Sequence, residues 1–472
     1  MAVVGVALLL GQAIYLFSTY WIAMWSSKSF DVQQEAHWIW GYAIMVAALL
    51  AVSLSRAQLY FAAALGAASR LHDAAAARVL RAPLAFFHTN PAGRVINRFS
   101  KDQSVLDEHL PAVSFDSLQA LMMVLGGFVL LMVVVPIIIP VFLPVMVALW
   151  LVYRWYVAAS SAVKRHEAVS RSPVFAQLSA VLRGLPSVRA YAARDRVRAD
   201  FLRALSVNGA WYFVYITCAR WVGFRLDVIV AALSAVAPLL MMAVHERMSA
   251  RLVGLALTQT LSLAGMLQWM VRQAADVENC MTSVERLVEY TQLDQEPPAL
   301  EEGGPAPPKD WPGDQSVVFE SVTAQYRPGL PPVLKDLSFA LPPGTRCGVV
   351  GRTGSGKSSL LLALFRLIPV TRGRVLLGGT DVARVALDCL RRQLAVIPQD
   401  PVLFSGTVRS NLDPWRAHED AALWQALRAV HLAGAAQALG GLSAPMHEAG
   451  DNWSVGQRQL LCLARALLQD AS

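Results

Sequence analysis

Charged residues are scarce in this sequence, and its cysteines form no recognisable pattern. Asp, Glu, Lys and Arg make up 16% of the 472 residues, against about 25% in an average soluble domain. Hydrophobic residues make up 55%, which excludes a disordered chain or a nucleic-acid-binding tail and argues against a purely soluble protein. The five cysteines are scattered and include no CxxC pair, so a reducing, cytosolic environment is a simpler interpretation than a disulfide framework.

A formal net charge of +8 would suit nucleic acid, but the basic residues do not form one patch. Six Lys and Arg residues occur within 70–111 and nine within 164–203, whereas 26–37 holds one and 135–140 none. Because cytosolic loops carry the excess of positive charge in membrane proteins, the two long loops are predicted to be cytosolic. Helical patterns at 69–80 and 168–183 predict helices that continue from the spans into these loops. No nucleic-acid partner is expected.

Long apolar runs predict six membrane spans. They cover 2–25, 38–65, 118–152, 228–244 and 252–270, and Arg56 is their only charged residue. A helix crosses a bilayer core with about 20 residues, so the 35-residue run 118–152, which contains Pro136, Pro140 and Pro144, is predicted to be a hairpin of two helices. A cleaved signal peptide is the alternative for the first run, although no basic residue precedes Lys28 as such a peptide would require.

The composition changes after Leu293. Region 295–315 contains six prolines and is predicted to be a linker that buries no core. Its acids are expected to be solvated: Glu296, Glu301, Glu302, Asp310 and Asp314. Strand-like runs follow at 317–322, 346–350, 374–377 and 393–397, with helical patterns at 357–366 and 387–392. This alternation predicts an α/β domain with a mostly parallel sheet.

The most specific motif lies in this second region. Gly351-Arg352-Thr353-Gly354-Ser355-Gly356-Lys357-Ser358 fits the P-loop pattern GxxxxGK[ST], here between a strand-like run and a helical one. Glycines let successive backbone N–H groups converge on phosphate oxygens, and the start of the helix adds positive potential. With Ser359 beside it, this loop predicts ATP as a ligand, with Lys357 on the β- and γ-phosphates and Ser358 on Mg²⁺. A chance glycine-rich turn is the alternative.

Two later segments add to this motif. Gln399 follows the run 394–397 and could ligate Mg²⁺ or orient water, although alone it would indicate a surface turn. The segment 452–459 opens an amphipathic pattern that reaches Leu468. Ser454 and Gly456 at the start of a helix would provide a second phosphate-binding geometry. Asn452-Trp453-Ser454 also matches the glycosylation pattern, which is a false positive if this domain is cytosolic.

Together these motifs resemble the nucleotide-binding domain of ABC transporters, and the six preceding spans resemble the exporter class. Four segments are similar to subfamily C, the multidrug-resistance-associated proteins: RAPLAFF at 81–87, NRFSKD at 97–102, SVER at 283–286 and FSGTVR at 404–409. The resemblance covers essentially the whole chain and is closest to the second half of a full transporter. Val455 stands where the usual signature has glycine, as second halves of this subfamily do.

The resemblance implies an all-α six-helix transmembrane domain over 1–290, a linker over 291–316 and a partial α/β nucleotide-binding domain over 317–472. Tyr326 would stack on adenine, with a core or edge-strand tyrosine as the alternative. Gln399 and Ser358 would hold Mg²⁺. A signature made of Ser454, Val455, Gly456 and Gln457 would contact ATP held by a second ABC half, which is the implied partner. The loops around 88–97 and 187–196 would transmit closure of the two domains to the spans.

The resemblance also shows what the 472 residues lack. They end at Gln469-Asp470-Ala471-Ser472, before the segment that supplies the Mg²⁺-binding Asp, the catalytic Glu and the switch His in the family. No catalytic residue is therefore expected in this chain, which by itself is expected not to hydrolyse ATP. A fragment, a truncated gene model or a partial half is the interpretation, and a genuine short form that cannot hydrolyse ATP is the alternative.

Arginine and tryptophan in the last two predicted spans indicate a substrate path. Arg220, Trp221 and Arg225 begin the fifth span, and Trp269 and Arg272 lie in the sixth. An arginine at mid-membrane costs about 2.5–3.5 kcal/mol on insertion scales, so it belongs near the interface or on a wet path. These positions resemble the ones that bind anionic conjugates in the subfamily. Snorkelling and interhelical pairing at the cytosolic end are an equally supported alternative.

Three functions follow from these patterns. The first is ATP-driven export of organic anions, conjugates or amphipathic drugs. The second is a channel-like or regulatory member whose nucleotide sites gate rather than pump, and the third is a non-functional fragment. In each case the chain is expected to be a multi-pass protein in contact with lipid, in the plasma or vacuolar membrane, with its nucleotide-binding domain in the cytosol.

Overall fold

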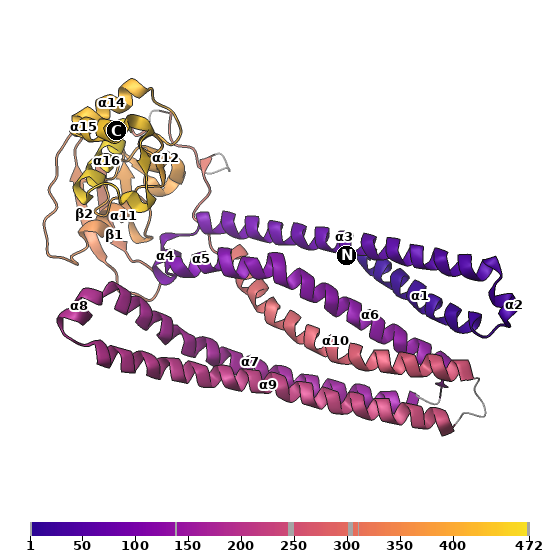
Figure 1. Ribbon diagram of the computed structural model, residues 1–472. Coiled ribbons are helices and arrows are strands. Elements are labelled where there is room, and N and C mark those ends of the chain that lie inside the picture. The colour runs from indigo at the N-terminus through magenta and orange to yellow at the C-terminus, as the bar shows by residue number, and fades with distance from the viewer. Residues whose placement is uncertain (1, 137–138, 244–249, 301–304, 310, 470–472) are drawn as a thin grey trace. The chain divides into compact units, whose positions relative to one another are not determined.

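The computed structural model describes residues 2–136, 139–243, 250–300, 305–309 and 311–469. The chain forms two compact units. The first, here called the helical unit, contains residues 1–79 and 93–292. The second, the mixed unit, contains residues 80–92 and 293–472. Figure 1 shows the long helices of the helical unit and the strands of the mixed unit.

Within the described residues, six helices are long and apolar enough to cross a membrane, which agrees with the predicted number of spans. They are α1 (Ala2–Trp25), α3 (Ala36–Leu80), α6 (Leu110–Val134), α7 (Ile139–Arg183), α9 (Arg194–Ala243) and α10 (Ala250–Thr291). The predicted hairpin is also confirmed, since α6 ends just before Pro136 and α7 begins at Ile139. Shorter elements join them: α2 (Phe30–Gln33), α5 (Ala92–Asn97), α8 (Leu185–Ala190) and π-helical turns at Arg98–Asp102 and Val105–His109.

A large apolar core of the helical unit lies between α6, α7, α9 and α10. Figure 1 shows α7 beside α9 and α6 beside α10. The buried core residues come from all four helices: Val124, Phe128, Leu131, Val135, Leu149, Val222, Leu226, Leu233, Ala256, Leu263, Leu267 and Val271. At 1.5 Å per residue, the 45 residues of α7 extend well beyond the ~30 Å of a bilayer core. The predicted continuation of the spans into long helices, including 69–80 and 168–183, is therefore confirmed.

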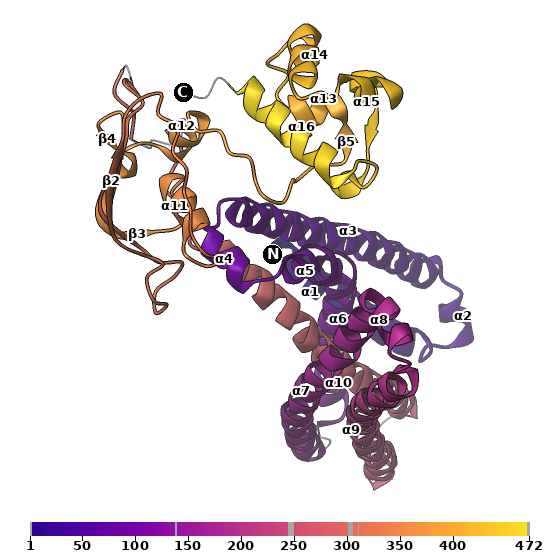
Figure 2. The same cartoon turned by 90° about the vertical axis from the view of Figure 1, so that its left-hand side faces the viewer.

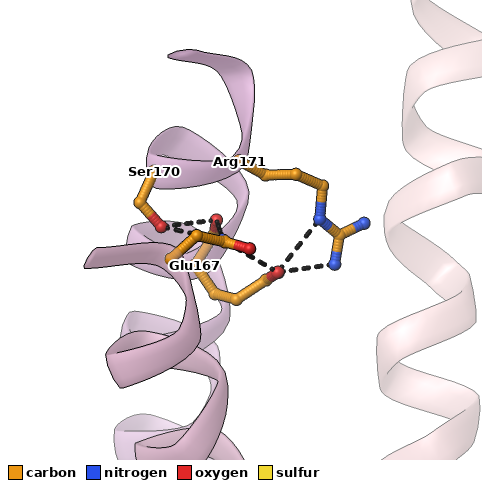
Figure 3. A network of polar contacts seen from close by, with 4 residues as sticks. Glu167, Ser170 and Arg171 are labelled. Atoms are coloured by element: carbon orange, nitrogen blue, oxygen red, sulfur yellow. Dashed lines mark hydrogen bonds and ion pairs between the residues drawn. The ribbon is translucent and has the colours of Figure 1, made fainter. Parts of the chain in front are cut away.

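A buried carboxylate ties α7 to α9 outside that core. Glu167 accepts two hydrogen bonds from Arg171 of the same helix, at 3.0 and 2.6 Å (Figure 3). The side-chain amide of Asn208 on α9 donates to the Glu167 carboxylate at 3.3 Å and to the Ser170 hydroxyl at 3.0 Å. Because every charged group here has a partner, this network joins α7 to α9 at low cost in desolvation.

The mixed unit contains two sheets and several short helices. A four-stranded sheet has the order β2-β1-β3-β4, and a two-stranded one pairs β5 with β6. The strands are β1 (Val317–Ala324), β2 (Leu334–Leu341), β3 (Val370–Leu377), β4 (Thr380–Asp381), β5 (Gly406–Thr407) and β6 (Pro445–Met446). The helices are α4 (Leu84–Thr89), α11 (Lys357–Leu364), α12 (Leu387–Arg392), α13 (Val408–Leu412), α14 (Asp420–Ala429), α15 (Ala433–Ala438) and α16 (Val455–Leu468).

Two separate cores divide this unit into lobes. Figure 2 shows the four-stranded sheet with α11 in one lobe and α13–α16 in the other. The sheet lobe buries Phe319, Val322, Ala363, Val375 and Leu390. The helical lobe buries a second cluster that includes Leu423, Leu427, Trp453 and Leu461. The predicted helices at 357–366 and 387–392 and the amphipathic helix up to Leu468 are all present, and the α/β class of the domain is confirmed.

The predicted parallel sheet is not found in the described part of the chain, where every strand pair is antiparallel. The strand-like runs 317–322 and 374–377 are strands, but 346–350 and 393–397 are not. Val350 is 97% exposed and Ile397 is 51% exposed. A strand persists when its backbone N–H and C=O groups pair with a neighbour, and neither run has such a neighbour among the described residues. The composition of these two runs predicts strands, but it cannot predict whether a neighbouring strand is present to pair with them.

The proline-rich segment after α10 is part of the mixed unit and is partly docked onto the rest of it. The Trp311 indole donates to the Leu377 carbonyl at 2.9 Å, and the Ala386 amide donates to the Pro305 carbonyl at 2.9 Å. The expectation that all its acids are solvated is wrong for Glu296, whose carboxylate forms an ion pair with Arg391. The Asp314 carboxylate accepts hydrogen bonds from Ser316. Glu301, Glu302 and Asp310 lie outside the described residues.

Candidate functional site

The P-loop segment forms an exposed turn that leads into α11. Gly354 and Gly356 have φ values of +83° and +93°, in the left-handed region that favours glycine. The side chain of Lys357 folds back over the turn, where its Nζ donates to the carbonyls of Gly351 and Arg352 at 2.6 and 2.8 Å. Gly351, Arg352, Thr353, Gly354 and Ser355 are exposed. The loop therefore presents backbone groups and one ammonium group to solvent.

The N-terminus of α11 fits a phosphate group. Its N-cap is Gly356, which offers no side-chain hydrogen bond to the first turn. The first N–H groups of a helix have no partner within the helix, and the positive end of the helix dipole favours an anion. A Cβ at Gly356 would lie 3.2 Å from the Val333 carbonyl oxygen, so a larger residue here would crowd the backbone. The arrangement matches the donor set that a nucleotide phosphate requires.

The two serines after Lys357 point in different directions. Ser358 is exposed beside the loop, as a Mg²⁺-ligating hydroxyl must be. Ser359 is buried, and its hydroxyl is within 2.8 Å of the Tyr326 hydroxyl. Only the backbone N–H of Ser359 remains for phosphate, a distinction that the motif alone does not make.

Gln399 is the second predicted Mg²⁺ ligand. It is exposed, and its backbone carbonyl accepts a hydrogen bond from the Gln459 side chain of α16 at 3.3 Å. The described residues contain no group of three or more His, Cys, Asp or Glu that could hold a metal by themselves. Mg²⁺ usually keeps several waters and is bound largely through substrate phosphates, so one hydroxyl and one amide suit such an ion when ATP accompanies it.

Tyr326 lies beside a pocket that sequence reasoning missed. The pocket has a volume of about 400 Å³ and is lined by Ala85, His88, Tyr326, Arg327 and Leu330. The ring of His88, from α4, packs edge-on against the Tyr326 ring with centroids 5.5 Å apart. His88 and Tyr326 are far apart in the sequence, and no local pattern links them. Tyr326 also packs against the core of the sheet lobe, so it combines the structural role considered from the sequence with an open aromatic face.

The signature residues begin α16. Ser454 is the N-cap, and its hydroxyl accepts a hydrogen bond from the Gln457 backbone N–H at 3.3 Å. The Gln457 side chain returns the contact by accepting from the Ser454 N–H at 2.9 Å, which completes a capping box. Val455 is 59% exposed, and a Cβ at Gly456 would meet nothing within 4 Å. Two N–H groups of this helix start are thus engaged within the chain, and the start is open to solvent.

Asn452 is engaged just before this helix. Its side-chain amide donates to the Pro445 carbonyl at 2.9 Å and its oxygen accepts from the His447 N–H at 3.2 Å. The amide nitrogen that a glycan would modify therefore has a structural role, consistent with the expectation that the glycosylation match is a false positive.

Arg465 fastens α16 to the segment after Gln399, and sequence reasoning did not identify it. Its guanidinium donates to the Val402 carbonyl and to the Asn411 side chain, both at 2.8 Å. Burial lowers the pKa of Arg465, although an arginine remains charged at physiological pH. The contact holds the signature helix in register with the loop that carries Gln399.

The predicted substrate-path residues lie in the helical unit, on α9 and α10. All five are exposed: Arg220, Trp221, Arg225, Trp269 and Arg272. The Arg225 guanidinium lies 4.7 Å from the centre of the Trp221 ring, a cation–π contact. Asp227 accepts a hydrogen bond from the Gln268 side chain of α10 at 2.9 Å. The structure thus brings Arg225 and Trp221 together on a face turned away from the apolar core.

Comparisons with known proteins agree with these motifs. A family model of the ABC transporter transmembrane region matches residues 1–270, and the ABC transporter model matches residues 334–472. ATP-binding cassette sub-family C member 4 of Mus musculus is 38% identical over 98% of this chain and 36% of its own length. Sub-family C member 10 of Mus musculus is 42% identical over 91% of this chain and 29% of its own length.

A third relative is the probable multidrug resistance-associated protein lethal(2)03659 of Drosophila melanogaster. It is 38% identical over 96% of this chain, which corresponds to 34% of that protein. The chain therefore spans about a third of the length of these curated relatives. The two mouse relatives that it resembles are members of sub-family C. Both domain models match in the order that the sequence predicts, and they show that this chain belongs to the ABC transporter family.

Proposed function

We propose that this chain forms one half of an ATP-driven exporter of organic anions, conjugates or amphipathic drugs. The observation that carries the proposal is the P-loop turn, where an uncapped helix start and Lys357 lie together at the surface. The subfamily relatives, among them one named for multidrug resistance, support export as the work that nucleotide binding drives. The whole transporter's activity is part of this proposal, since the chain covers about a third of those relatives.

The chain's own residues would bind the nucleotide in a defined order from base to phosphate. The exposed face of Tyr326 would stack on adenine. The N–H groups of the loop 351–359 and the Lys357 ammonium would bind the phosphates, for which Lys357 would exchange its two carbonyl contacts. Ser358 and Gln399 would hold the Mg²⁺, which supplies charge neutralisation at the phosphates when bound.

The signature helix is proposed to serve a second nucleotide-binding domain. Ser454, Val455, Gly456 and Gln457 would contact the γ-phosphate of ATP on that partner, so the partner is a second ABC half. The open surroundings of Gly456 support this role, because a phosphate could approach the backbone there. The capping box between Ser454 and Gln457 would then yield some of its hydrogen bonds to the partner's nucleotide.

The proposed cargo is anionic because the exposed faces of α9 and α10 carry three arginines beside two tryptophans. Trp221 and Trp269 are 39% and 42% exposed, and they offer flat apolar area for an organic body. A guanidinium can bind a carboxylate or sulfate bidentately and stays charged. The positive charge of the loops 70–111 and 164–203 supports a cytosolic nucleotide-binding domain, in the plasma or vacuolar membrane.

Transport in inside-out vesicles tests the cargo. Arg272→Gln should reduce ATP-dependent uptake of a glutathione conjugate more than uptake of a neutral drug, normalised to protein in the membrane. Trp269→Ala should reduce both, because it removes contact area and no charge. Arg272→Lys separates the alternatives, since snorkelling needs only a cation whereas bidentate binding needs the planar fork. Equal losses for anionic and neutral substrates would reject the anion site, and nucleotide-gated flux without uphill uptake would favour a channel.

We also propose that these 472 residues by themselves bind MgATP without hydrolysing it. The Mg²⁺-binding Asp and the catalytic Glu that the family resemblance implies have no counterpart among these 472 residues. Phosphoryl transfer depends on the positioning and electrostatics that such carboxylates provide. Phosphate release by the purified chain in lipid would measure this directly. A vanadate-sensitive turnover that Lys357→Ala removes would contradict the proposal.

A further inference from the structure

The segment between α10 and the sheet is anchored by a two-pronged ion pair. The Arg391 guanidinium donates to both oxygens of the Glu296 carboxylate, each at 2.8 Å. The two side chains are 30% and 22% exposed, so water screens the pair less than it screens an ordinary surface pair. A bidentate arginine–carboxylate contact defines orientation as well as distance. Glu296 is therefore held in one position on α12.

Each partner of this pair makes a further contact with the backbone of another segment. The Glu296 N–H donates to the Arg81 carbonyl at 2.9 Å, and the Arg391 Nε donates to the Phe365 carbonyl at 3.3 Å. Arg81 directly follows α3, and Phe365 is the C-cap of α11. Four segments of the mixed unit, which are far apart in sequence, thus meet at two side chains.

Neighbouring contacts hold the same segment along α12. The Leu300 N–H donates to the Asp388 carboxylate at 3.0 Å, and this hydrogen bond lowers the pKa of Asp388. Another basic side chain near Arg391 is Arg366, whose pKa is lowered by burial and by repulsion from Arg391. The carboxylates of Asp381 and Glu296 act in the opposite direction and raise the pKa of Arg366. Removing Glu296 would leave Arg366 and Arg391 close together without that carboxylate.

The positions of these contacts in the chain suggest what the pair does. Glu296 lies five residues after the end of α10 at Thr291, and Arg81 lies one residue after the end of α3 at Leu80. Arg391 lies on α12, which leads into the segment that carries Gln399, and it contacts the end of α11, whose first residue is the P-loop lysine. The pair therefore joins the segments that directly follow α3 and α10 in the chain to the C-terminal end of α11 and to α12, all within the mixed unit.

We propose that Glu296 and Arg391 form a joint that transmits nucleotide occupancy at the P-loop to the ends of α3 and α10. They are positioning residues, since neither touches the nucleotide. A change at α11 or at the Gln399 segment would move Arg391, and the bidentate contact would carry the movement to Glu296 and, through its N–H, to Arg81. The inference rests on the proposed function for its link to transport, but the joint itself is a property of the mixed unit.

The test uses the whole transporter in membranes, with Glu296→Ala, Arg391→Ala and the double variant. Glu320→Ala is the matched control, because it breaks a more exposed pair with Arg374 on the sheet of the same unit. Three quantities are measured: photolabelling by an azido-ATP probe, ATP-dependent uptake of a glutathione conjugate, and trypsin cleavage within 292–311 with and without MgATP. If Glu296 and Arg391 act as one unit, the double variant should lose no more ATP-dependent uptake than either single variant.

The expected result is loss of coupling without loss of binding. Photolabelling should persist in Glu296→Ala, and MgATP should no longer change trypsin cleavage. Uptake should fall by about tenfold, within the usual range of coupling between two sites. Photolabelling that falls in parallel with uptake would overturn the joint, because the pair would then only support the fold of the nucleotide site. Unchanged uptake, or the same MgATP-dependent cleavage in variant and wild type, would overturn it as well.

The cleavage measurement separates this inference from the proposed function. A wild-type protein that binds ATP but does not transport the conjugate would contradict the proposed export. The joint would still stand if MgATP alters cleavage of 292–311 in the wild type and not in Glu296→Ala, and it would fall if MgATP alters neither.

Discussion

The starts of α11 and α16 are two helix N-termini that the sequence assigns to the same kind of ligand, yet they are built differently. The N-cap of α11 is a left-handed glycine with no side-chain hydrogen bond, and a lysine lies over the turn. The N-cap of α16 is Ser454, whose hydroxyl and backbone are both engaged with Gln457. Backbone N–H groups at a helix start need a partner. The start of α11 has no side-chain cap and suits a ligand, whereas the capping box at the start of α16 already engages two N–H groups.

This difference suggests a division of labour between the two ends of the domain. The P-loop turn is proposed to bind phosphate within this chain, because the uncapped start of α11 favours an anion. The signature turn would have to exchange its capping hydrogen bonds for contacts to a phosphate. We expect that exchange to be favourable only when a partner domain already binds the rest of the nucleotide. The chain alone is therefore expected to bind ATP at α11, and α16 to contribute only in a paired assembly.

The largest expected effect is at Lys357. Lys357→Ala should abolish photolabelling of this chain by azido-ATP, because it removes the ammonium that lies over the P-loop turn and would pair with the negative charges of the nucleotide. Lys335→Ala, on strand β2 of the same unit, is the control and should label normally. Undiminished labelling of Lys357→Ala would show that the nucleotide does not bind at this turn.

Tyr326 should have the next largest effect on nucleotide affinity. Tyr326→Ala should weaken binding by about 1–3 kcal/mol if stacking of bases on aromatic side chains in nucleic-acid sites is a guide. Tyr326→Phe keeps the ring and removes only the hydroxyl bonded to Ser359, so it should bind nearly as well. Titration with a fluorescent ATP analogue compares the two variants. Equal losses for alanine and phenylalanine would assign the effect to the Ser359 hydrogen bond and not to stacking.

A matched pair of glycine variants compares the two helix starts directly. Gly356→Ala places a Cβ at a φ of +93° and 3.2 Å from a carbonyl oxygen, so it should cost about 1–2 kcal/mol of folding free energy. Gly456→Ala faces open space at the first turn of a helix and should leave stability nearly unchanged. Thermal unfolding of the detergent-solubilised chain measures both. Similar melting temperatures for the two variants would mean that the left-handed turn is not required.

The smallest effect is expected from the capping box. Ser454→Ala should destabilise the protein by about 1 kcal/mol, the usual value for a lost N-cap, and leave ATP binding at α11 unchanged. Photolabelling and thermal unfolding of the same preparation separate these effects. A loss of labelling in the chain without a partner would contradict the division of labour, since Ser454 would then contact the chain's own nucleotide.

Sequence reasoning was most reliable where a local pattern carried the information. Apolar length predicted the spans, and residue spacing predicted α11, α12 and α16. It was wrong about the parallel sheet, because the strand tendency of 346–350 could not reveal whether a partner strand was present. It was also wrong about the solvation of Glu296, whose partner Arg391 lies 95 positions further along the chain. Which residues bind nucleotide and substrate remains a prediction from motifs.

The sequence by itself determined the class of this protein, the six spans among its described residues and the position of its P-loop turn, since hydrophobic length and a short run of glycines, lysine and serine act locally. Only the tertiary structure decided which hydroxyl of the Ser358–Ser359 pair faces the loop, that His88 lies against Tyr326, and that Glu296, Arg391 and Arg81 meet. These contacts join segments that are distant along the chain, and their geometry depends on how helices and strands pack, which no short-range pattern specifies.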